Sequence, residues 1–199
     1  MNKWDTAQHS EADFWNTCTK TYVEETKQFF YATRMKLGFH DYPLSSIDFQ
    51  GKSVLDIGSG PTSLLLKGHN YSKAVAADPL MNTFPEWVRE RYRSVGITPL
   101  SIGGEDLDTT QHFDEILIYN VLQHVQDFEL ILYKSRKIAN VIRVVEWLEV
   151  PSDSLHPHVL KEEVLNRCLG GNGMVEQVHE PYMFDAQMYY GVFKGFDNK

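Results

Sequence analysis

The sequence predicts an α/β fold, a doubly wound sheet of seven strands that is mostly parallel and ends in an antiparallel hairpin. Two observations predict it. Five strand-like runs alternate with helix-like segments between residues 54 and 169, the pattern of parallel strands joined by crossover helices. Two further strand-like runs, 175–179 and 188–194, are separated by only about eight residues. Because that connection is too short for a helical crossover, the last two strands should be antiparallel.

Each element is assigned from local pattern. The five parallel strands are expected at 54–57, 73–77, 97–102, 114–119 and 141–148. The run 114–119 is almost entirely apolar, as expected of a strand buried on both faces. Helices are expected at 62–67, 86–94, 127–139 and 161–169. Pro61 suits the start of the first of them, because proline is well tolerated at the first helical position.

Upstream of the sheet, residues 10–37 lack strong helix breakers and place aromatic side chains at roughly helical spacing. They predict one or two amphipathic helices that end at Gly38. We therefore expect a single domain over residues 1–199, with a helical cap at 1–45 and the sheet core at 52–195.

Composition limits the possible partners. The net charge is 19 − 27 = −8, and the chain has no Lys/Arg run, so it is poorly suited to bind a nucleic acid backbone. Cys18 and Cys168 lie far apart, which fits a reducing compartment better than a disulfide framework. The N-terminus is polar and acidic, unlike a signal peptide, and no apolar run approaches the ~18 residues of a membrane span. We expect a cytoplasmic protein without membrane contact.

The stretch "KSVLDIGSGPTSLLL" indicates a binding loop for a nucleotide-type cofactor. Gly58 and Gly60 allow a sharp turn after the first strand and a close approach of the backbone to a ligand. A helix at 62–67 would direct its free N–H groups at an anionic group there. A dinucleotide fingerprint would need a third glycine where Ser63 stands, and Asp56 suits a cationic amino group better than a pyrophosphate.

Four segments together, "VLDIGSGPTSLLL", "AVAADPL", "GEDL" and "FDEILIYNVLQHV", resemble the class I S-adenosylmethionine-dependent methyltransferases. The similarity is greatest to the compact, Rossmann-like members of that family that act on small molecules. It covers roughly residues 53–193, with the N-terminal helices as a cap. The chain departs from the family pattern at Thr62, where a third glycine is often found, and this puts the detailed shape of the loop in question.

The resemblance implies S-adenosylmethionine as cofactor and S-adenosylhomocysteine as product. The glycine loop would hold the methionyl carboxylate, and Asp56 would meet the ammonium group through water. Asp78, twenty residues after the first glycine, would accept hydrogen bonds from the ribose hydroxyls. Asp106 or its competitor Glu105 would accept from the adenine amino group. The cofactor-binding residues expected in this way are Asp56, Gly58, Ser59, Gly60, Asp78, Pro79, Glu105, Asp106, Leu107, Asn120 and Val121.

A general base is needed if the acceptor must lose a proton. His124 is the first candidate, because a neutral imidazole accepts a proton near pH 7, but packing or helix capping is an alternative role. Glu149 and His156 follow as further candidates near the end of the fifth strand. His156 and His158 could both face a metal, but no further ligands are evident, so no metal site is expected. Trp4, His9, Phe14, Trp15 and Tyr22 could form a lid or simply pack.

Three functions remain open at this level. The favoured one is methyl transfer from S-adenosylmethionine to the O or N atom of a small molecule. A non-catalytic protein that binds S-adenosylmethionine or S-adenosylhomocysteine with the same fold is the alternative. An NAD-linked oxidoreductase is disfavoured by the missing glycine. A nucleic-acid methyltransferase is disfavoured because Asn120 is followed by Val-Leu rather than two prolines, and neither cysteine follows a proline. The acceptor and the oligomeric state have no signature in the sequence.

Overall fold

A computed structural model describes residues 3–16, 21–38, 46–153, 155–179 and 186–196. Seven strands form one sheet in the order β3-β2-β1-β4-β5-β7-β6. They are β1 (Ile47–Ile57), β2 (Gly68–Ala77), β3 (Ile97–Leu100), β4 (Phe113–Tyr119), β5 (Ala139–Leu148), β6 (Met174–Val178) and β7 (Ala186–Lys194). The first five are parallel, and β7 pairs antiparallel with both β5 and β6. The predicted mostly parallel sheet with an antiparallel C-terminal pair is confirmed.

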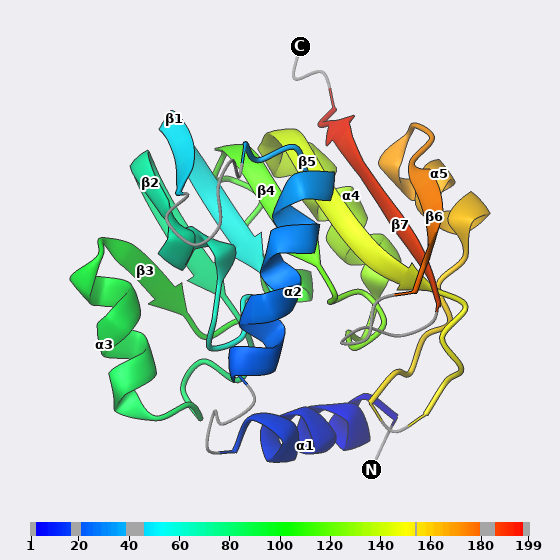
Figure 1. Ribbon diagram of the computed structural model, residues 1–199, viewed down its shortest axis with the longest axis horizontal. Helices are drawn as coiled ribbons and strands as arrows, with labels where there is room; N and C mark the ends of the chain where they lie inside the picture. The colour runs from blue at the N-terminus through cyan, green and yellow to red at the C-terminus, as the bar shows by residue number, and fades with distance from the viewer. Residues whose placement is uncertain (1–2, 17–20, 39–45, 154, 180–185, 197–199) are drawn as a thin grey trace.

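Helices cover both faces of the sheet (Figure 1). Helices α2 (Thr21–Arg34) and α3 (Glu86–Ser94) contribute Tyr31 and Tyr92 to one apolar cluster. Helices α4 (Phe128–Ile138) and α5 (Glu162–Leu169) contribute Ile131 and Leu165 to a second cluster on the other face. The interior strands are apolar on both sides, since each of these faces is covered.

Helix α1 (Lys3–Trp15) lies across the end of the sheet to which the parallel strands point (Figure 1). Ligands bind at this carboxyl edge in open α/β sheets. None of the described helices combines the length and apolar character that a membrane crossing requires. The cap is therefore formed by α1 over the strand ends and α2 along one face.

The helix expected at 62–67 is only partly formed, and no α-helix is found there. Residues 58–67 instead form a loop and one 3₁₀ turn, η1 (Leu64–Lys67). The reason is length, because β1 begins at Ile47 and Ile57 must be connected back to Gly68, which pairs beside Ile47. Only ten residues, 58–67, make that return, and the glycine loop takes the first six of them, which leaves four for η1.

From β1 onward, the other helix and strand boundaries differ from those expected by at most two residues, except at the starts of β1 and β2. Strands β1 and β2 begin earlier than expected and β3 ends at Leu100. A short 3₁₀ turn, η2 (Gly104–Asp106), follows β3 and bears on the site described below.

Candidate functional site

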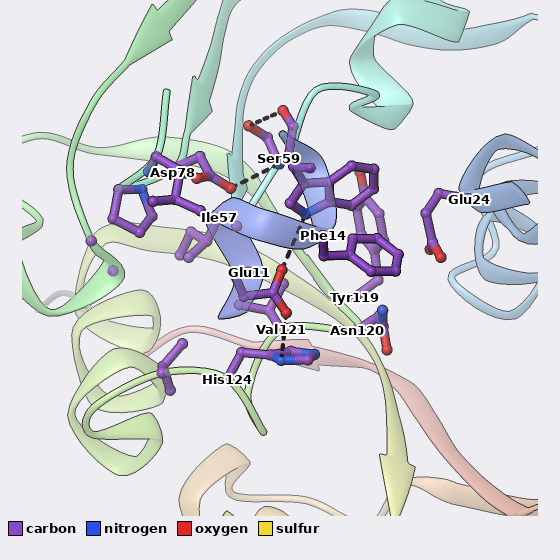
Figure 2. A pocket seen from close by; sticks show the side chains of 18 of the residues that line it. Glu11, Phe14, Glu24, Ile57, Ser59, Asp78, Tyr119, Asn120, Val121 and His124 are labelled. Carbon is purple, nitrogen blue, oxygen red and sulfur yellow. Dashed lines mark hydrogen bonds and ion pairs between the residues drawn. The ribbon is translucent and has the colours of Figure 1, made fainter. Parts of the chain in front are cut away.

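A cavity of about 230 Å³ opens at the carboxyl ends of β1, β2 and β4, beneath α1 (Figure 2). Loops that follow the strands form one wall, and α1, α2 and residues 155–156 form the other. Ten of the residues predicted from the sequence line the cavity, namely Gly58, Ser59, Gly60, Asp78, Pro79, Glu105, Asn120, Val121, His124 and His156. The remaining candidates, Asp56, Asp106, Leu107 and Glu149, do not line it.

The glycine loop has the backbone that its sequence predicts. Gly58 and Gly60 have φ values of +68° and +55°, in the left-handed region that glycine adopts most readily. A Cβ atom added at Gly58 would lie 2.5 Å from Cγ2 of Val121 on the neighbouring strand end. The loop is therefore pressed against the turn after β4, with no room for a side chain at this position.

The N–H groups of this loop are mostly occupied by the protein itself. Gly58 and Ser59 both donate to the carbonyl of Ala77, and Gly60 donates to Asp78. Hydroxyl groups of two tyrosines accept the next N–H groups, Tyr92 that of Ser63 and Tyr119 that of Leu64. The N–H groups of Leu65 and Leu66 also bond within the turn. The anion-binding helix N-terminus predicted from the sequence is thus missing.

Asp56 is completely buried behind the cavity wall rather than exposed to it. Its Oδ2 accepts hydrogen bonds from the hydroxyls of Ser63 and Tyr119, and its Oδ1 has no partner among the described residues. Burial raises the pKa of this carboxyl to about 7, against the lowering effect of the two hydroxyl donors. Direct contact with a ligand is excluded in this arrangement, so Asp56 shapes the loop from behind.

Asp78 does face the cavity and is held rigidly by the backbone (Figure 2). Its Oδ2 accepts the N–H of Gly60 at 2.9 Å and its Oδ1 that of Leu80 at 2.8 Å. Burial raises its pKa to about 6. Each carboxylate oxygen has a second lone pair, so Asp78 retains capacity to accept hydrogen bonds from a ligand.

Two neighbouring acids, Glu105 and Asp106, follow β3 in η2, and only the first of them lines the cavity. Glu105 lines the cavity, and its Oε1 accepts the N–H groups of Gln126 at 2.9 Å and Asp127 at 3.1 Å before α4. Its Oε2 makes no hydrogen bond to the described part of the chain. Asp106 is exposed and turned away from the cavity, and Leu107 is packed in the apolar core. The acid available to a ligand here is therefore Glu105.

The turn after β4 is fixed by a buried carboxylate. Glu146 on β5 is completely buried and accepts the N–H groups of Val121 and Leu122 at 3.0 and 3.1 Å. Burial raises its pKa to about 7. Asn120 has a positive φ of 55°, so the backbone turns sharply at the cavity floor. Glu146 acts on the site through this turn and does not line the cavity itself.

His124 is held in one tautomer by its neighbours. Its Nδ1 lies 2.9 Å from the carbonyl oxygen of Leu155 and 3.0 Å from Oε1 of Glu11 on α1 (Figure 2). Because a carbonyl oxygen can only accept, Nδ1 carries the proton and Nε2 is the lone-pair nitrogen of the neutral ring. Nε2 makes no hydrogen bond to the described residues and is not one of their fully buried polar atoms. As far as the described residues show, Nε2 is therefore available to a ligand.

Charge around His124 favours its protonated form. Burial alone lowers the pKa of the imidazole, but the hydrogen bond and charge of Glu11 outweigh it, and the pKa lies above its usual value. Burial raises the pKa of Glu11, and the bonds from His124 and Trp15 reverse this, so its pKa lies below its usual value. Glu11 and His124 thus form an ion pair at moderately acid pH.

The other two proposed bases differ in position. The His156 ring lies 4.7 Å from that of His124, centroid to centroid, and its Nδ1 is 2.9 Å from Oδ1 of Asp153. Burial and the charge of His124 lower the pKa of His156. Glu149 is exposed and lies outside the cavity, because its positive φ of 55° turns the chain away at the end of β5. Glu149 is therefore not placed to act on a ligand.

Most of the cavity wall formed by the cap was not predicted from the sequence. Four residues of α2 at helical spacing line the cavity, namely Glu24, Lys27, Gln28 and Tyr31. Glu11 was also not singled out, although Trp4, Phe14 and Trp15 of the suggested lid do line the cavity. His9 does not, and the side chain of Tyr22 lies outside the described parts. The i, i+3, i+4, i+7 spacing on α2 is a signal that could have identified this face.

Neither Met81, which is buried in the core, nor Trp87, which is about half exposed, lines the cavity. Within the described ranges, no three His, Cys, Asp or Glu side chains are arranged to hold a metal ion.

The contact between Gly58 and Val121 predicts an asymmetry between glycine substitutions. Gly58→Ala should lower the free energy of unfolding by more than ~1 kcal/mol, since it adds a steric clash to the strain of a positive φ. Gly51→Ala is the matched control, because Gly51 also has a positive φ (+75°) but no atom within 4 Å of an added Cβ. Urea denaturation of both variants measures the difference. Equal losses would contradict the close contact.

The Glu11–His124 pair predicts a pH-dependent contribution to stability. Its contribution is lost as pH rises through the raised pKa of His124 and as pH falls through the lowered pKa of Glu11. Glu11→Ala should therefore lower the melting temperature more at pH 6 than at pH 9. Asp13→Ala, at an exposed position of the same helix, should show no such difference. Thermal melts at both pH values test this, and a pH-independent loss in Glu11→Ala would refute it.

No model of a protein family matches the sequence, and no curated protein matches it significantly. Solved structures do match over nearly the whole chain. The N-methyltransferase NodS of Bradyrhizobium japonicum WM9, in complex with S-adenosyl-L-homocysteine, is similar with a TM-score of 0.67 and 14% identity, covering 99% of this chain and 100% of that one.

Two further methyltransferases agree in fold. Magnesium protoporphyrin IX methyltransferase (ChlM) from Synechocystis PCC 6803, with bound SAM, has a TM-score of 0.60 and 12% identity, covering 98% of both chains. The 1,6-didemethyltoxoflavin-N1-methyltransferase of Burkholderia thailandensis, with its substrate and S-adenosylhomocysteine, has a TM-score of 0.59 and 16% identity, covering 95% of this chain and 84% of that one. The protein described here therefore has the class I S-adenosylmethionine-dependent methyltransferase fold.

Proposed function

We propose that the protein transfers a methyl group from S-adenosylmethionine to an O or N atom of a small molecule. One observation supports this above all. A single cavity brings the glycine loop and Asp78 together with His124, whose Nε2 is an open proton acceptor. Similar solved structures hold S-adenosylhomocysteine or SAM.

The wall residues fit the cofactor in chemistry. Asp78 retains lone pairs for two ribose hydroxyls, and Oε2 of Glu105 remains available for an exocyclic amino group. Gly58 and Gly60 leave the backbone accessible where side chains would fill the space. When bound, S-adenosylmethionine supplies an electrophilic methyl group on a sulfonium.

The protein would orient the methyl acceptor and remove its proton. Fixing an acceptor in line with the methyl group can contribute up to ~7–11 kcal/mol in ideal cases. His124 would accept the proton of a hydroxyl or protonated amine through Nε2, while Leu155 and Glu11 hold the ring from the Nδ1 side. His156, beside it, would help to position the acceptor.

Binding tests the cofactor assignment directly. Asp78→Ala should weaken S-adenosylhomocysteine binding by about a hundredfold or more, because two charge-assisted hydrogen bonds are lost. Asp106→Ala removes a neighbouring acid that is exposed outside the cavity, and it should change affinity less than twofold. Isothermal titration calorimetry measures both. Unchanged affinity in Asp78→Ala would refute its role.

Transfer itself is tested with methyl-labelled S-adenosylmethionine and a panel of hydroxyl and amine metabolites. Labelled product together with S-adenosylhomocysteine is the expected result. Tight binding with no turnover on any acceptor would favour the alternative, a non-catalytic protein that binds the cofactor.

The pH profile of transfer identifies the base. The rate should fall as pH drops through the raised pKa of His124, since protonation removes the lone pair of Nε2. Glu11→Gln removes the charge that raises this pKa, so the acidic limb should move to lower pH. The Glu11–His124 pair also has other titratable neighbours, namely His156, Asp153 and Glu146. His156→Gln is therefore the control and should keep an acidic limb, and a limb that does not move in Glu11→Gln would contradict the assignment.

A further inference from the structure

The glycine loop of this protein has few free N–H groups with which to bind the anionic end of S-adenosylmethionine. The methionyl arm of S-adenosylmethionine ends in a carboxylate. Among residues 58–66, all of which the structure describes, every backbone N–H except that of Thr62 already has an acceptor within the protein. Pro61 has no N–H, and η1 is a single 3₁₀ turn rather than an α-helix. The backbone thus offers at most one donor where a helix N-terminus would offer several.

A positive side chain stands near that place. Lys27 on α2 is the one lysine or arginine among the described residues that line the cavity. The next residue, Gln28, donates from its side-chain amide to the carbonyl of Thr62, which fastens α2 to the glycine loop. Lys27 and Thr62 therefore lie in the same part of the cavity wall, beside the glycine loop.

The ammonium group of Lys27 belongs to a largely buried side chain and is paired with a carboxylate. Its side chain is 10% exposed, and its Nζ lies 2.7 Å from Oε1 of Glu24, one helical turn earlier. Carboxylates otherwise dominate the cavity wall, at Glu11, Asp78 and Glu105 as well. A carboxylate that enters the cavity would be repelled by these acids, and Lys27 is the lysine or arginine of the described lining that could attract it. An ammonium has three donors, so it can bind a second anion while it keeps Glu24.

We propose that Lys27 binds the carboxylate of the methionyl arm, and so replaces the helix N-terminus that the short β1–β2 connection cannot form. This proposal rests on the proposed function, because it assumes that the ligand is S-adenosylmethionine or S-adenosylhomocysteine. It makes α2 part of the cofactor site and not merely a cover over the acceptor. The protein should accordingly discriminate between ligands that carry this carboxylate and ligands that lack it.

A comparison of two ligands isolates the contact. Decarboxylated S-adenosylmethionine keeps the adenosine, the sulfonium and the amine and lacks only the carboxylate. Lys27→Met should weaken S-adenosylmethionine binding about tenfold to a hundredfold, the range of one charge-assisted hydrogen bond, and leave binding of the decarboxylated compound unchanged or stronger. Titration calorimetry of the wild-type protein and of Lys27→Met with each ligand measures the four affinities that are compared. Lys27→Arg should restore most of the discrimination.

The controls separate this contact from general damage. Lys36→Met makes the same substitution at an exposed residue just beyond α2 and should change neither affinity. The double variant Glu24→Gln/Lys27→Met removes the pair together, so that no unpaired carboxylate is left in the wall, and should show the same selective loss as Lys27→Met. An equal loss for both ligands, or no loss for either, would overturn the proposal. If wild-type protein binds neither ligand, the proposed function itself fails.

Discussion

The buried carboxylate of Asp56 is the interaction on which the shape of the site depends. It draws in the hydroxyls of Ser63 and Tyr119. Tyr119 in turn accepts the N–H of Leu64, while Tyr92 bridges the N–H of Ser63 and the carbonyl of Gly60. The network closes the loop where an α-helix would otherwise begin. Because breaking any of these buried hydrogen bonds would leave a further polar group without a partner, the network favours one loop conformation.

This constraint has consequences on both sides of the cavity. On the sheet side, the closed loop leaves Asp78 and Glu105 as rigid acceptors, each fixed by backbone N–H groups. On the cap side, charged groups of α1 and α2 provide what the loop lacks, with Glu11 at the imidazole of His124 and Lys27 beside the loop. The sheet edge thus provides carboxylate acceptors, and the cap provides the partner of the imidazole and the lysine of the cavity wall.

Sequence patterns predicted the parts of this arrangement that depend on local structure. The alternation of strands and helices, the antiparallel end and the positive φ angles at Gly58 and Gly60 follow from short segments. The helix at 62–67 could not be judged locally, because the early start of β1 at Ile47 decides how far the return connection must reach. The choice between Glu105 and Asp106 depends on the direction of one 3₁₀ turn. The roles of Glu11 and Lys27 could not be inferred from local sequence, because only tertiary packing brings the cap to the strand ends.

The most direct test of this account is a crystal structure determined with S-adenosylhomocysteine present. The account predicts the ribose at Asp78, the adenine amino group at Glu105, and the amino-acid arm between the glycine loop and α2. Density for the compound at another surface, or a cavity that stays closed to it at saturating concentration, would contradict the claim that this crevice is a cofactor site.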